Sequence, residues 1–327
     1  NEEMGLGKNE VRKLLPYGAL ATVCDVMELK GENRIIVKEG IEAFKTNSDV
    51  GINALIKECA LDKRNLSAYH FGFVIGPCLN ASGRLDTAKK AFELLVSIDA
   101  NRANELAVKL KKLNDERKEL TEKSAKEAIE SAKEDDNPVL VIFLKNCHES
   151  IAGIVAGRVR EAYNKPVFIL TEAQEGVKGS GRSIEEYDMY SELTRVKELL
   201  TKFGGHKMAA GVSLKRENIE LFRKKLNDNC NLTREDLYLK VHIDMQLPLE
   251  YVTINIVNEL KTLEPFGKGN EKPLFAEKNL KIIKFQIIGK AGNTIKLIVE
   301  NASHYRMKAL IFNRTVEFMA FLKEKFG

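Results

Sequence analysis

Two glycine-rich segments carry the side chains best suited to binding phosphate. The segment Lys178-Gly-Ser-Gly-Arg-Ser183 combines glycines, which permit close approach of the backbone, with the hydroxyl of Ser180 and the guanidinium of Arg182. The second segment, Gly204-Gly205-His206, adds an imidazole. Either segment alone is typical of a tight turn. Two such loops in one domain, however, favour a phosphate-binding cleft.

Three further positions have residue types suited to ligand binding, each with a structural alternative. Asn80-Ala-Ser-Gly-Arg84 is a small-residue turn that offers the side chains of Asn80 and Arg84. His148 lies between a predicted strand and a predicted helix, where α/β sheets place ligands and a helix N-terminus favours phosphate; a structural histidine fits equally well. Asp25 ends an apolar segment and could bind a divalent cation, although a single carboxylate there is more typical of a helix cap or a turn.

The sequence lacks the motifs of several enzyme classes. It contains no G-x-x-x-x-G-K-[ST], no strand-linked G-x-G-x-x-G, no H-E-x-x-H and no G-x-S-x-G. An ATPase, a dinucleotide-dependent enzyme, a zinc protease and an α/β-hydrolase therefore lose their main support. The five cysteines lie far apart without a C-x-x-C pair, which argues against a zinc ribbon or a thioredoxin motif and predicts reduced thiols.

Composition and charge predict a globular, mildly basic protein. Of 327 residues, 52 are Lys or Arg and 47 are Asp or Glu, which gives a formal net charge of +5. This balance suits a polyanionic partner without requiring one. No apolar run approaches the roughly 18–20 residues of a membrane span, and no secretory leader opens the chain. We therefore expect a cytoplasmic protein with no membrane partner.

The elements that must position these residues begin with one long helix. Residues 100–133 are rich in Lys, Glu, Leu and Ala, without Gly or Pro, and Leu106, Leu110, Leu113 and Leu120 form a narrow apolar stripe. Such a helix typically bridges two domains. After Pro138, strands and helices alternate, which predicts a parallel α/β domain with strands at 139–144, 167–171 and 209–214 and helices at 151–163, 189–203 and up to about 229.

The last region has the pattern of a small β-barrel. Short strands are predicted at 239–243, 280–288, 294–299 and 307–312. An OB-type barrel fits this number and length of strands. Phe275, Phe285 and Tyr305 are its candidates for base stacking, although core packing is the commoner fate of such residues.

Six motifs follow one another along nearly the whole chain. They are Thr22-Val-Cys-Asp25-Val-Met-Glu-Leu with Gly31-Glu-Asn-Arg34, Gly76-Pro-Cys-Leu-Asn-Ala-Ser-Gly-Arg84-Leu-Asp, His148-Glu-Ser-Ile-Ala-Gly-Ile-Val-Ala, Gly179-Ser-Gly-Arg-Ser183, Phe203-Gly-Gly-His206-Lys-Met-Ala-Ala-Gly and Leu263-Glu-Pro-Phe-Gly-Lys-Gly-Asn270. In this order they resemble the RecJ family of single-stranded-DNA-specific exonucleases, in the DHH phosphoesterase superfamily.

The resemblance implies an α/β fold in four parts. These are the C-terminal remnant of a DHH domain (1–95), a connecting helix (96–135), a DHHA1 domain (136–232) and an incomplete OB-fold (233–327). The family's earlier motifs, including the Asp-His-His triplet, have no counterpart in this sequence. We expect them to lie before Asn1, and the closing strands of the OB-fold to lie beyond Gly327.

The resemblance also implies an activity. The family hydrolyses phosphodiester bonds of single-stranded DNA from 5′ to 3′ with a metal-activated water, using Mn²⁺ or Mg²⁺, in DNA recombination and repair. A single-strand-binding protein and a helicase are candidate partners. By position, Asp25 matches a metal ligand and is catalytic together with His206. The implied DNA-binding residues are Asn80, Arg84, His148, Ser180, Arg182, Gly204 and Gly205.

Two departures from the family pattern leave alternatives open. Ser150 replaces the glycine of a His-Glu-Gly turn, and Cys78 stands where the family commonly has Arg, so that one basic contact to DNA is missing. With Asp25 as the only family metal ligand, we expect this chain alone to be inactive, and a non-catalytic single-strand-binding fragment is a second interpretation. A DHH/DHHA1 phosphodiesterase acting on oligoribonucleotides or cyclic dinucleotides is a third, disfavoured by the barrel and the Leu263–Asn270 motif. A purely structural protein is disfavoured by the ordered motifs.

Overall fold

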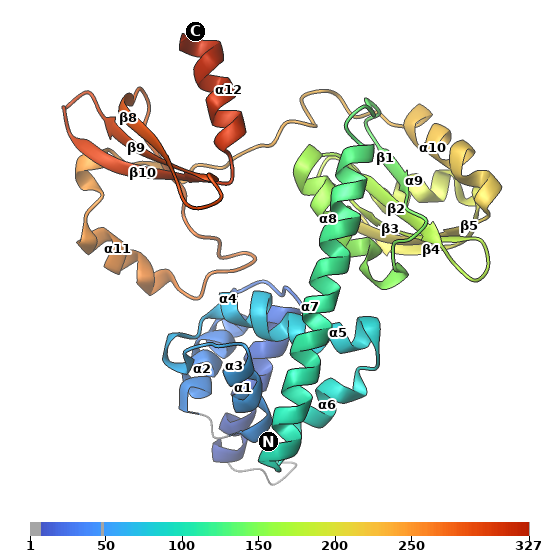
Figure 1. Cartoon of the computed structure of the whole chain (residues 1–327), viewed down its shortest axis with the longest axis horizontal. Helices are drawn as coiled ribbons and strands as arrows, with labels where there is room; N and C mark the ends of the chain where they lie inside the picture. The colour runs from blue at the N-terminus through green and yellow to red at the C-terminus, as the bar shows by residue number, and fades with distance from the viewer. Residues whose placement is uncertain (1–7, 47–48, 327) are drawn as a thin grey trace. The chain divides into compact units, whose positions relative to one another are not determined.

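The computed structural model describes residues 8–46 and 49–326, and the chain divides into two compact units (Figure 1). Unit 1 comprises the described parts of Asn1–Val26 and Glu39–Lys240, and unit 2 those of Met27–Lys38 and Val241–Gly327. The α-helices are α1 (Lys8–Cys24), α2 (Gly31–Thr46), α3 (Val50–Glu58), α4 (Ala68–His70), α5 (Gly76–Leu85), α6 (Lys89–Leu95), α7 (Ala100–Ser131), α8 (Ala152–Tyr163), α9 (Met189–Arg195), α10 (Ile219–Asp228), α11 (Ile254–Leu260) and α12 (Thr315–Phe326). The strands are β1 (Leu140–Phe143), β2 (Val167–Glu172), β3 (Val177–Arg182), β4 (Leu200–His206), β5 (Ala209–Leu214), β6 (Met245–Gln246), β7 (Phe275–Ala276), β8 (Lys281–Ile288), β9 (Thr294–Glu300) and β10 (Arg306–Phe312).

The predicted turn at residues 80–84 is wrong, because this segment is the second half of helix α5. Pro77 lies in the first turn, where a helix tolerates proline. The buried hydroxyl of Ser82 donates to the carbonyl oxygen of Leu79 at 2.9 Å, so the helix interior accommodates it. Arg84 consequently lies in the last turn of a helix, four residues after Asn80 on the same side.

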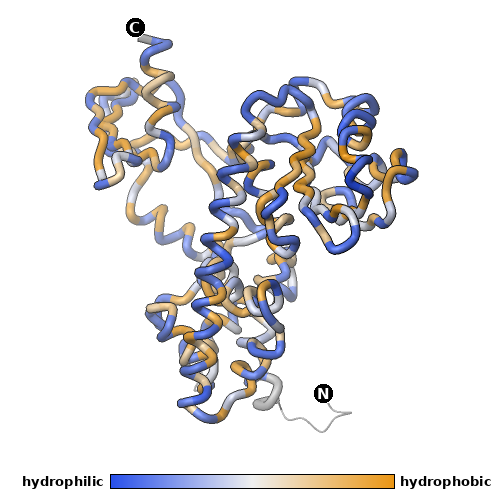
Figure 2. Tube along the Cα trace, turned by 45° about the vertical axis from the view of Figure 1, so that its right-hand side comes forward, coloured by the Kyte–Doolittle hydropathy of each residue, from blue (hydrophilic) through white to orange (hydrophobic). Residues whose placement is uncertain are grey.

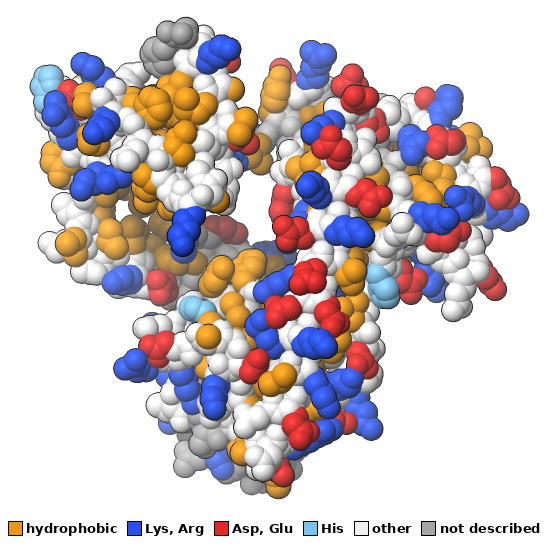
Figure 3. Space-filling view, viewed as in Figure 1, with side chains coloured by type: hydrophobic (Ala, Val, Ile, Leu, Met, Phe, Trp, Pro, Cys, Tyr) orange, Lys and Arg blue, Asp and Glu red, His pale blue; other side chains and the backbone are white. Residues whose placement is uncertain are grey.

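The predicted long helix is α7, which Asp99 caps through its carboxylate. Leu106 and Leu110 are buried as predicted, but Leu120 is 43% exposed, so the prediction of a continuous leucine stripe is wrong there. The second half of α7, which contains Leu120, packs against α8, and small residues let the two helices approach closely. The buried residues of that half are Thr121, Ser124, Ala125 and Ala128. On the face seen in Figure 3, acidic and basic side chains are interspersed along α7.

The α/β domain of unit 1 contains a mixed sheet with the strand order β1-β2-β3-β5-β4. Within it β1 and β2 are parallel and all other neighbours are antiparallel, so the predicted parallel sheet is wrong beyond the first pair. The physical reason is that both glycine-rich segments are strands rather than loops. Residues 178–182 belong to β3, and residues 203–206 form the end of β4. The predicted helix 189–203 accordingly ends at Arg195.

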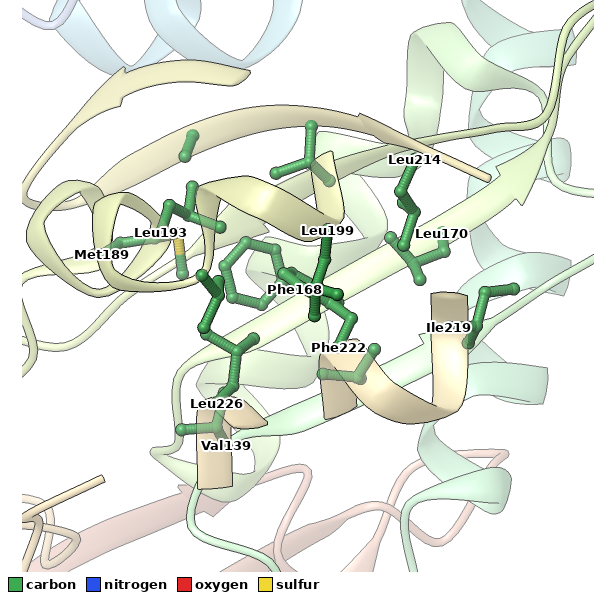
Figure 4. Packing of buried hydrophobic residues seen from close by; sticks show 14 of the residues in the cluster. Val139, Phe168, Leu170, Met189, Leu193, Leu199, Leu214, Ile219, Phe222 and Leu226 are labelled. Atoms are coloured by element: carbon green, nitrogen blue, oxygen red, sulfur yellow. The ribbon is translucent and has the colours of Figure 1, made fainter. Parts of the chain in front are cut away.

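Helices α9 and α10 cover one face of this sheet with a hydrophobic core. In that core the rings of Phe168 and Phe222 meet edge to face, with their centroids 5.4 Å apart (Figure 4). On the opposite face, α8 packs over β2 and β3. Figure 2 shows strongly hydrophobic strands in the middle of this domain. The part of the second face formed by β5 and β4 carries exposed residues, which Lys202, Gly204 and Gly211 exemplify.

Unit 2 contains a three-stranded antiparallel sheet with the order β10-β9-β8 and the parallel pair β6-β7. Strands at 280–288, 294–299 and 307–312 are confirmed, but residues 239–243 form no strand. Leu239 is 68% exposed, and pairing begins only where Met245 meets Phe275. The core of this unit gathers around the buried face of β9, which presents Ile295, Leu297 and Val299.

Two of the sequence motifs meet inside unit 2. The guanidinium of Arg34 donates hydrogen bonds to the three successive carbonyl oxygens of residues 262–264, at 3.3, 3.0 and 3.3 Å. The amide of Asn270 donates to the carbonyl oxygens of Leu263 and Pro265 at 2.8 and 2.9 Å. The Leu263–Asn270 motif is therefore a loop whose backbone acceptors are satisfied by side chains from both motifs.

Candidate functional site

The register of β3, β5 and β4 places the polar residues of the two glycine-rich segments on one face of the sheet. Residues paired across neighbouring strands point to the same side. The pairing produces three rows across the strands. These rows are Lys178–Ser213–Lys202, Ser180–Gly211–Gly204 and Arg182–Ala209–His206.

The glycines of the middle row leave the strand backbone uncovered by side chains, and we call this part of the face the glycine floor. A Cβ added at Gly204 would meet no atom within 4 Å, and one at Gly211 would meet only the carbonyl oxygen of Gly179 at 4.0 Å. Both glycines are exposed, and Lys202 and His206 flank Gly204 along β4. A ligand can therefore reach the strand backbone between cationic and hydrogen-bonding side chains.

Arg182 forms the best-positioned positive charge of this face. One of its terminal nitrogens lies 2.8 Å from the position of a Cβ at Gly153, so the guanidinium rests on the start of α8. Its other terminal nitrogen donates to the carbonyl oxygen of Gly181 at 2.8 Å. Among the described residues no carboxylate forms an ion pair with it. Burial lowers the pKa of Arg182, and the nearby positive charges of Arg84 and Arg160 lower it further.

A second partly buried arginine extends this positive region. Arg117, on α7, donates to the side-chain oxygen of Asn114 at 2.9 and 3.2 Å. Burial lowers the pKa of Arg117, with further contributions from Arg84 and Arg158. Arginines from α5, α7, α8 and β3 thus repel one another in the absence of an anion. Such a cluster is suited to phosphate, which accepts hydrogen bonds from guanidinium groups in pairs.

The rim of the cleft is formed by the segment that follows β1. The cleft has a volume of about 550 Å³ and is lined by Glu149 and Ser150 together with the first two rows above, and the third row continues the same face of the sheet beside it. Lys178 pairs with Glu149 across the rim at 2.9 Å, and Arg84 donates to the carbonyl oxygen of Ser150 at 2.7 Å. Helix α5 is thereby joined to the edge of the cleft.

The two predicted histidines have different surroundings. The Nδ1 atom of His206 accepts a hydrogen bond from the backbone N–H of Met208 at 3.2 Å, so in the neutral ring Nε2 carries the proton and can donate to a ligand. The Nδ1 atom of His148 lies 2.7 Å from Ser150 Oγ and accepts from the Ser150 N–H at 3.3 Å. His148 therefore caps the short 3-10 helix at Glu149–Ile151, as its structural alternative predicted.

The structure brings together several of the predicted site residues and separates others. Ser180, Arg182, Gly204 and His206 share the cleft face, and Arg84 and His148 lie at its rim. Gly205 pairs with Ala210, so it faces the other side, and its φ of +153° with backbone 2.3 Å from its Cβ position requires glycine. Asn80 is exposed on α5.

Asp25 lies in the turn that ends α1, and its carboxylate is exposed. Among the described residues, no group of three or more His, Cys, Asp or Glu side chains could hold a metal ion. The described donors therefore do not fit a divalent cation by themselves, because such ions take about six oxygen or nitrogen ligands. Asp25 alone can supply at most two of these ligand atoms, which are its two carboxylate oxygens.

Sequence reasoning missed several residues of the cleft. Lys202, Gly211 and Ser213 lie in the three rows, and Arg117 and Arg160 belong to the arginine cluster. Strand register brings the first three to the cleft, and helix packing brings the two arginines close to Arg84 and Arg182. The one signal in the sequence is the alternation in 209–214 of small residues (Ala209, Gly211, Ser213) with apolar ones (Ala210, Val212, Leu214), which marks a strand with one face open.

Comparison with known proteins gives consistent matches for both units. The DHHA1 domain family model matches residues 136–232, and the RecJ OB domain model matches residues 243–326. The single-stranded-DNA-specific exonuclease RecJ of Bacillus subtilis is 32% identical over 297 residues, which cover 89% of this chain and 38% of that protein. The corresponding Escherichia coli protein is 30% identical over 91% of this chain and 54% of its own length.

Solved structures agree with these matches. Thermus thermophilus RecJ in complex with Mg²⁺ superposes with a TM-score of 0.84 at 28% identity, covering 96% of this chain and 48% of that one. The Mn²⁺ complex from the same organism gives a TM-score of 0.82 at 27% identity, covering 96% and 46%. The chain thus spans about half, or less, of the length of these relatives. None of the helices described here is long and apolar enough to cross a membrane.

Proposed function

The chain belongs to the RecJ family of single-stranded-DNA-specific exonucleases, and from this premise we propose that it holds the phosphate backbone of a single DNA strand for 5′ to 3′ hydrolysis in recombination and repair. The observation that carries the proposal is the cleft face of β3, β5 and β4, where a bare glycine floor is flanked by basic and hydroxyl side chains. Phosphate contacts of this kind dominate the affinity of proteins for nucleic acids.

Each residue of the cleft has a role that follows from its position. Arg182, resting on α8, binds a non-bridging phosphate oxygen, and the desolvation of its charge strengthens that contact. Ser180 and the Nε2 atom of His206 donate hydrogen bonds from the neighbouring rows. Gly204 and Gly211 let the sugar-phosphate chain approach the strands. Arg84 supports the rim and adds positive charge.

The hydrolytic step needs groups beyond those described. The Thermus relatives were solved with Mg²⁺ and with Mn²⁺, which agrees with the cations expected from the sequence. We propose that Asp25 contributes one ligand to such a cation. Contacts with a single-strand-binding protein or a helicase remain predictions.

A single-strand-binding role without catalysis is the second candidate. The cleft contains phosphate donors from β3, β4 and β5, whereas no described group of side chains could hold a metal ion. In this interpretation the 327 residues bind DNA but do not cleave it.

One experiment separates the two candidates. A 5′-labelled single-stranded oligonucleotide is incubated with Mn²⁺ and either these 327 residues or a full-length form of the same chain that includes the family's earlier motifs, and release of mononucleotides and binding are both followed. Cleavage by the full-length protein together with binding by both proteins is the expected result. If the full-length protein releases nothing while both bind, the binding role is the better description; if these residues do not bind, the assignment of the cleft is wrong.

A further inference from the structure

Two cysteines outside the cleft lie within reach of each other in unit 1. The sulfur atoms of Cys59 and Cys78 are 3.8 Å apart, although the residues belong to different helices. Cys59 is the C-cap of α3, and Cys78 lies in the first turn of α5; both helices pack against α7. In a disulfide the two sulfurs are about 2.05 Å apart. The two thiols therefore need to close a gap of only about 1.8 Å.

The surroundings give the two thiols different reactivity. Cys59 is half-buried, and its pKa is lowered by the hydrogen bond with the Cys78 thiol and by the charges of Lys111 and Lys118, against the opposing effects of burial and Glu58. Cys78 is buried, and its pKa is raised by the same hydrogen bond and by burial. A thiolate is the form that oxidants attack. Cys59 is thus the reactive member.

Asn114 and Arg117 fix the position of the Cys78 side chain beside Cys59. The side-chain amide of Asn114, which is 1% exposed, donates to the Cys78 sulfur at 3.4 Å. The Asn114 oxygen is in turn fixed by Arg117 at 2.9 Å. Because the Asn114 amide donates to the Cys78 sulfur, it leaves the Cys78 S–H free for the contact with Cys59, in which either sulfur can be the donor.

We propose that Cys59 and Cys78 are a redox modification site, at which a hydroperoxide converts the two thiols into an intramolecular disulfide. The Cys59 thiolate attacks the terminal oxygen of the hydroperoxide, so that an S–O bond forms, the O–O bond breaks and the leaving alkoxide takes up a proton. The Cys78 sulfur then attacks the Cys59 sulfenic acid: the S–S bond forms, the S–O bond breaks, and the proton of Cys78 leaves with the hydroxide as water. Two thiols lose two electrons, and one hydroperoxide is reduced; hydrogen peroxide yields two water molecules.

The other cysteines lack this arrangement. The pKa values of Cys147 and Cys230 are raised, in each case mainly by burial. Among the described residues, no other pair of thiols is in contact. The modification is therefore specific to one pair, and it joins α3 to α5 beside α7.

The test uses the reduced 327-residue chain and one equivalent of hydrogen peroxide. After denaturation, the remaining thiols are alkylated and the peptides are mapped by mass spectrometry. The number of alkylated cysteines should fall from the five in the sequence to three, with one peptide pair joining Cys59 to Cys78. Dithiothreitol should restore all five.

Variants assign the two roles. C78S should accumulate a sulfenic acid at Cys59 that dimedone traps, whereas C59S should give no adduct at Cys78. C230S is the matched control and should keep the Cys59–Cys78 linkage. A wild-type chain that retains all its alkylatable thiols, forms disulfides between two molecules, or links other cysteines overturns the proposal, and this measurement does not depend on whether the variants fold.

Discussion

Replacement of Arg182 by methionine should weaken single-stranded DNA binding without weakening the fold. The guanidinium lies over the start of α8 near the positive charges of Arg84 and Arg160, and burial and these charges lower its pKa. In the free protein its charge is therefore held at a cost. Methionine retains most of the aliphatic stem and removes that charge. The thermal midpoint of R182M should be equal to that of the wild type or higher.

The loss of affinity follows from one charged contact. A hydrogen bond to a charged group contributes roughly 1.5–3 kcal/mol, and about 1.4 kcal/mol corresponds to a tenfold change in affinity. We therefore expect R182M to bind about ten- to a hundredfold more weakly at low salt. Loss of one phosphate contact to a single strand should also reduce the slope of log K against log salt by about 0.7.

The assay is fluorescence anisotropy with a labelled oligo-thymidine at several salt concentrations, beside thermal unfolding of each protein. R195M is the matched control, because Arg195 lies on α9, on the opposite side of the sheet, where it pairs with Glu192 at 3.0 Å. It loses the same charge but should keep both the affinity and the slope. Equal losses in R182M and R195M would show that only net charge matters and would refute the assigned role.

Three further predictions test the cleft and unit 2. G204V should abolish binding and leave thermal unfolding unchanged, since a Cβ at this position meets no atom within 4 Å. G181A should lower the unfolding free energy by about 1–3 kcal/mol, because its Cβ would lie 2.4 Å from the Met189 sulfur. If G204V destabilises the fold more than G181A does, or if G181A weakens binding more than G204V does, the assignment of the two faces is contradicted. R34M should lower the unfolding free energy of unit 2 by roughly 0.5–1.5 kcal/mol, because the exposed acceptors at 262–264 exchange the guanidinium donor for water, as calorimetry can measure. Arg306, and then His304, hold the pKa of Glu300 below its usual range. The contribution of Glu300 to stability is therefore present above about pH 4.3, the ordinary pKa of Glu, and is lost as pH falls through the lowered pKa. E300Q should remove that part of the acid destabilisation, and the same fall of the unfolding free energy with pH in E300Q and the wild type would contradict this.

Local patterns in the sequence predicted the elements whose signals are long or repeated. The helix α7, the strands β1, β2 and β5, and the three strands of the unit 2 sheet all come from periodicity over several residues. Leu120 was misassigned because α7 changes its packing partners along its length, from α3, α5 and α6 to α8. The periodicity of a sequence does not show which element a helix packs against. Residues 239–243 have an apolar pattern of a strand but no neighbouring strand to pair with.

The candidate site was predictable in its residue types but not in its geometry. Ser180, Arg182 and His206 could be selected because guanidinium, hydroxyl and imidazole groups bind phosphate. Lys202, Arg117 and Arg160 could not, because only the β4–β5 register brings Lys202 to the cleft, and only the packing of α7 and α8 brings the two arginines near Arg84 and Arg182. The resemblance supplied Arg84, which as a turn residue carried little weight by itself.

The error over the glycine-rich segments shows what glycine does in this cleft. Glycine weakens a strand, and so two glycine-rich segments favoured loops. In the structure the glycines serve opposite faces of the same sheet. Cβ atoms at Gly179 and Gly181 would collide with Leu170 and Met189 at 2.4 Å, so these two permit the core to pack against β3, whereas Gly204 and Gly211 leave backbone bare on the ligand side. A loop could offer the same bare backbone, but antiparallel pairing on both sides of β5 holds it in fixed register with Arg182 and His206. Placing the site on strands reduces the conformational entropy lost when a phosphate backbone binds.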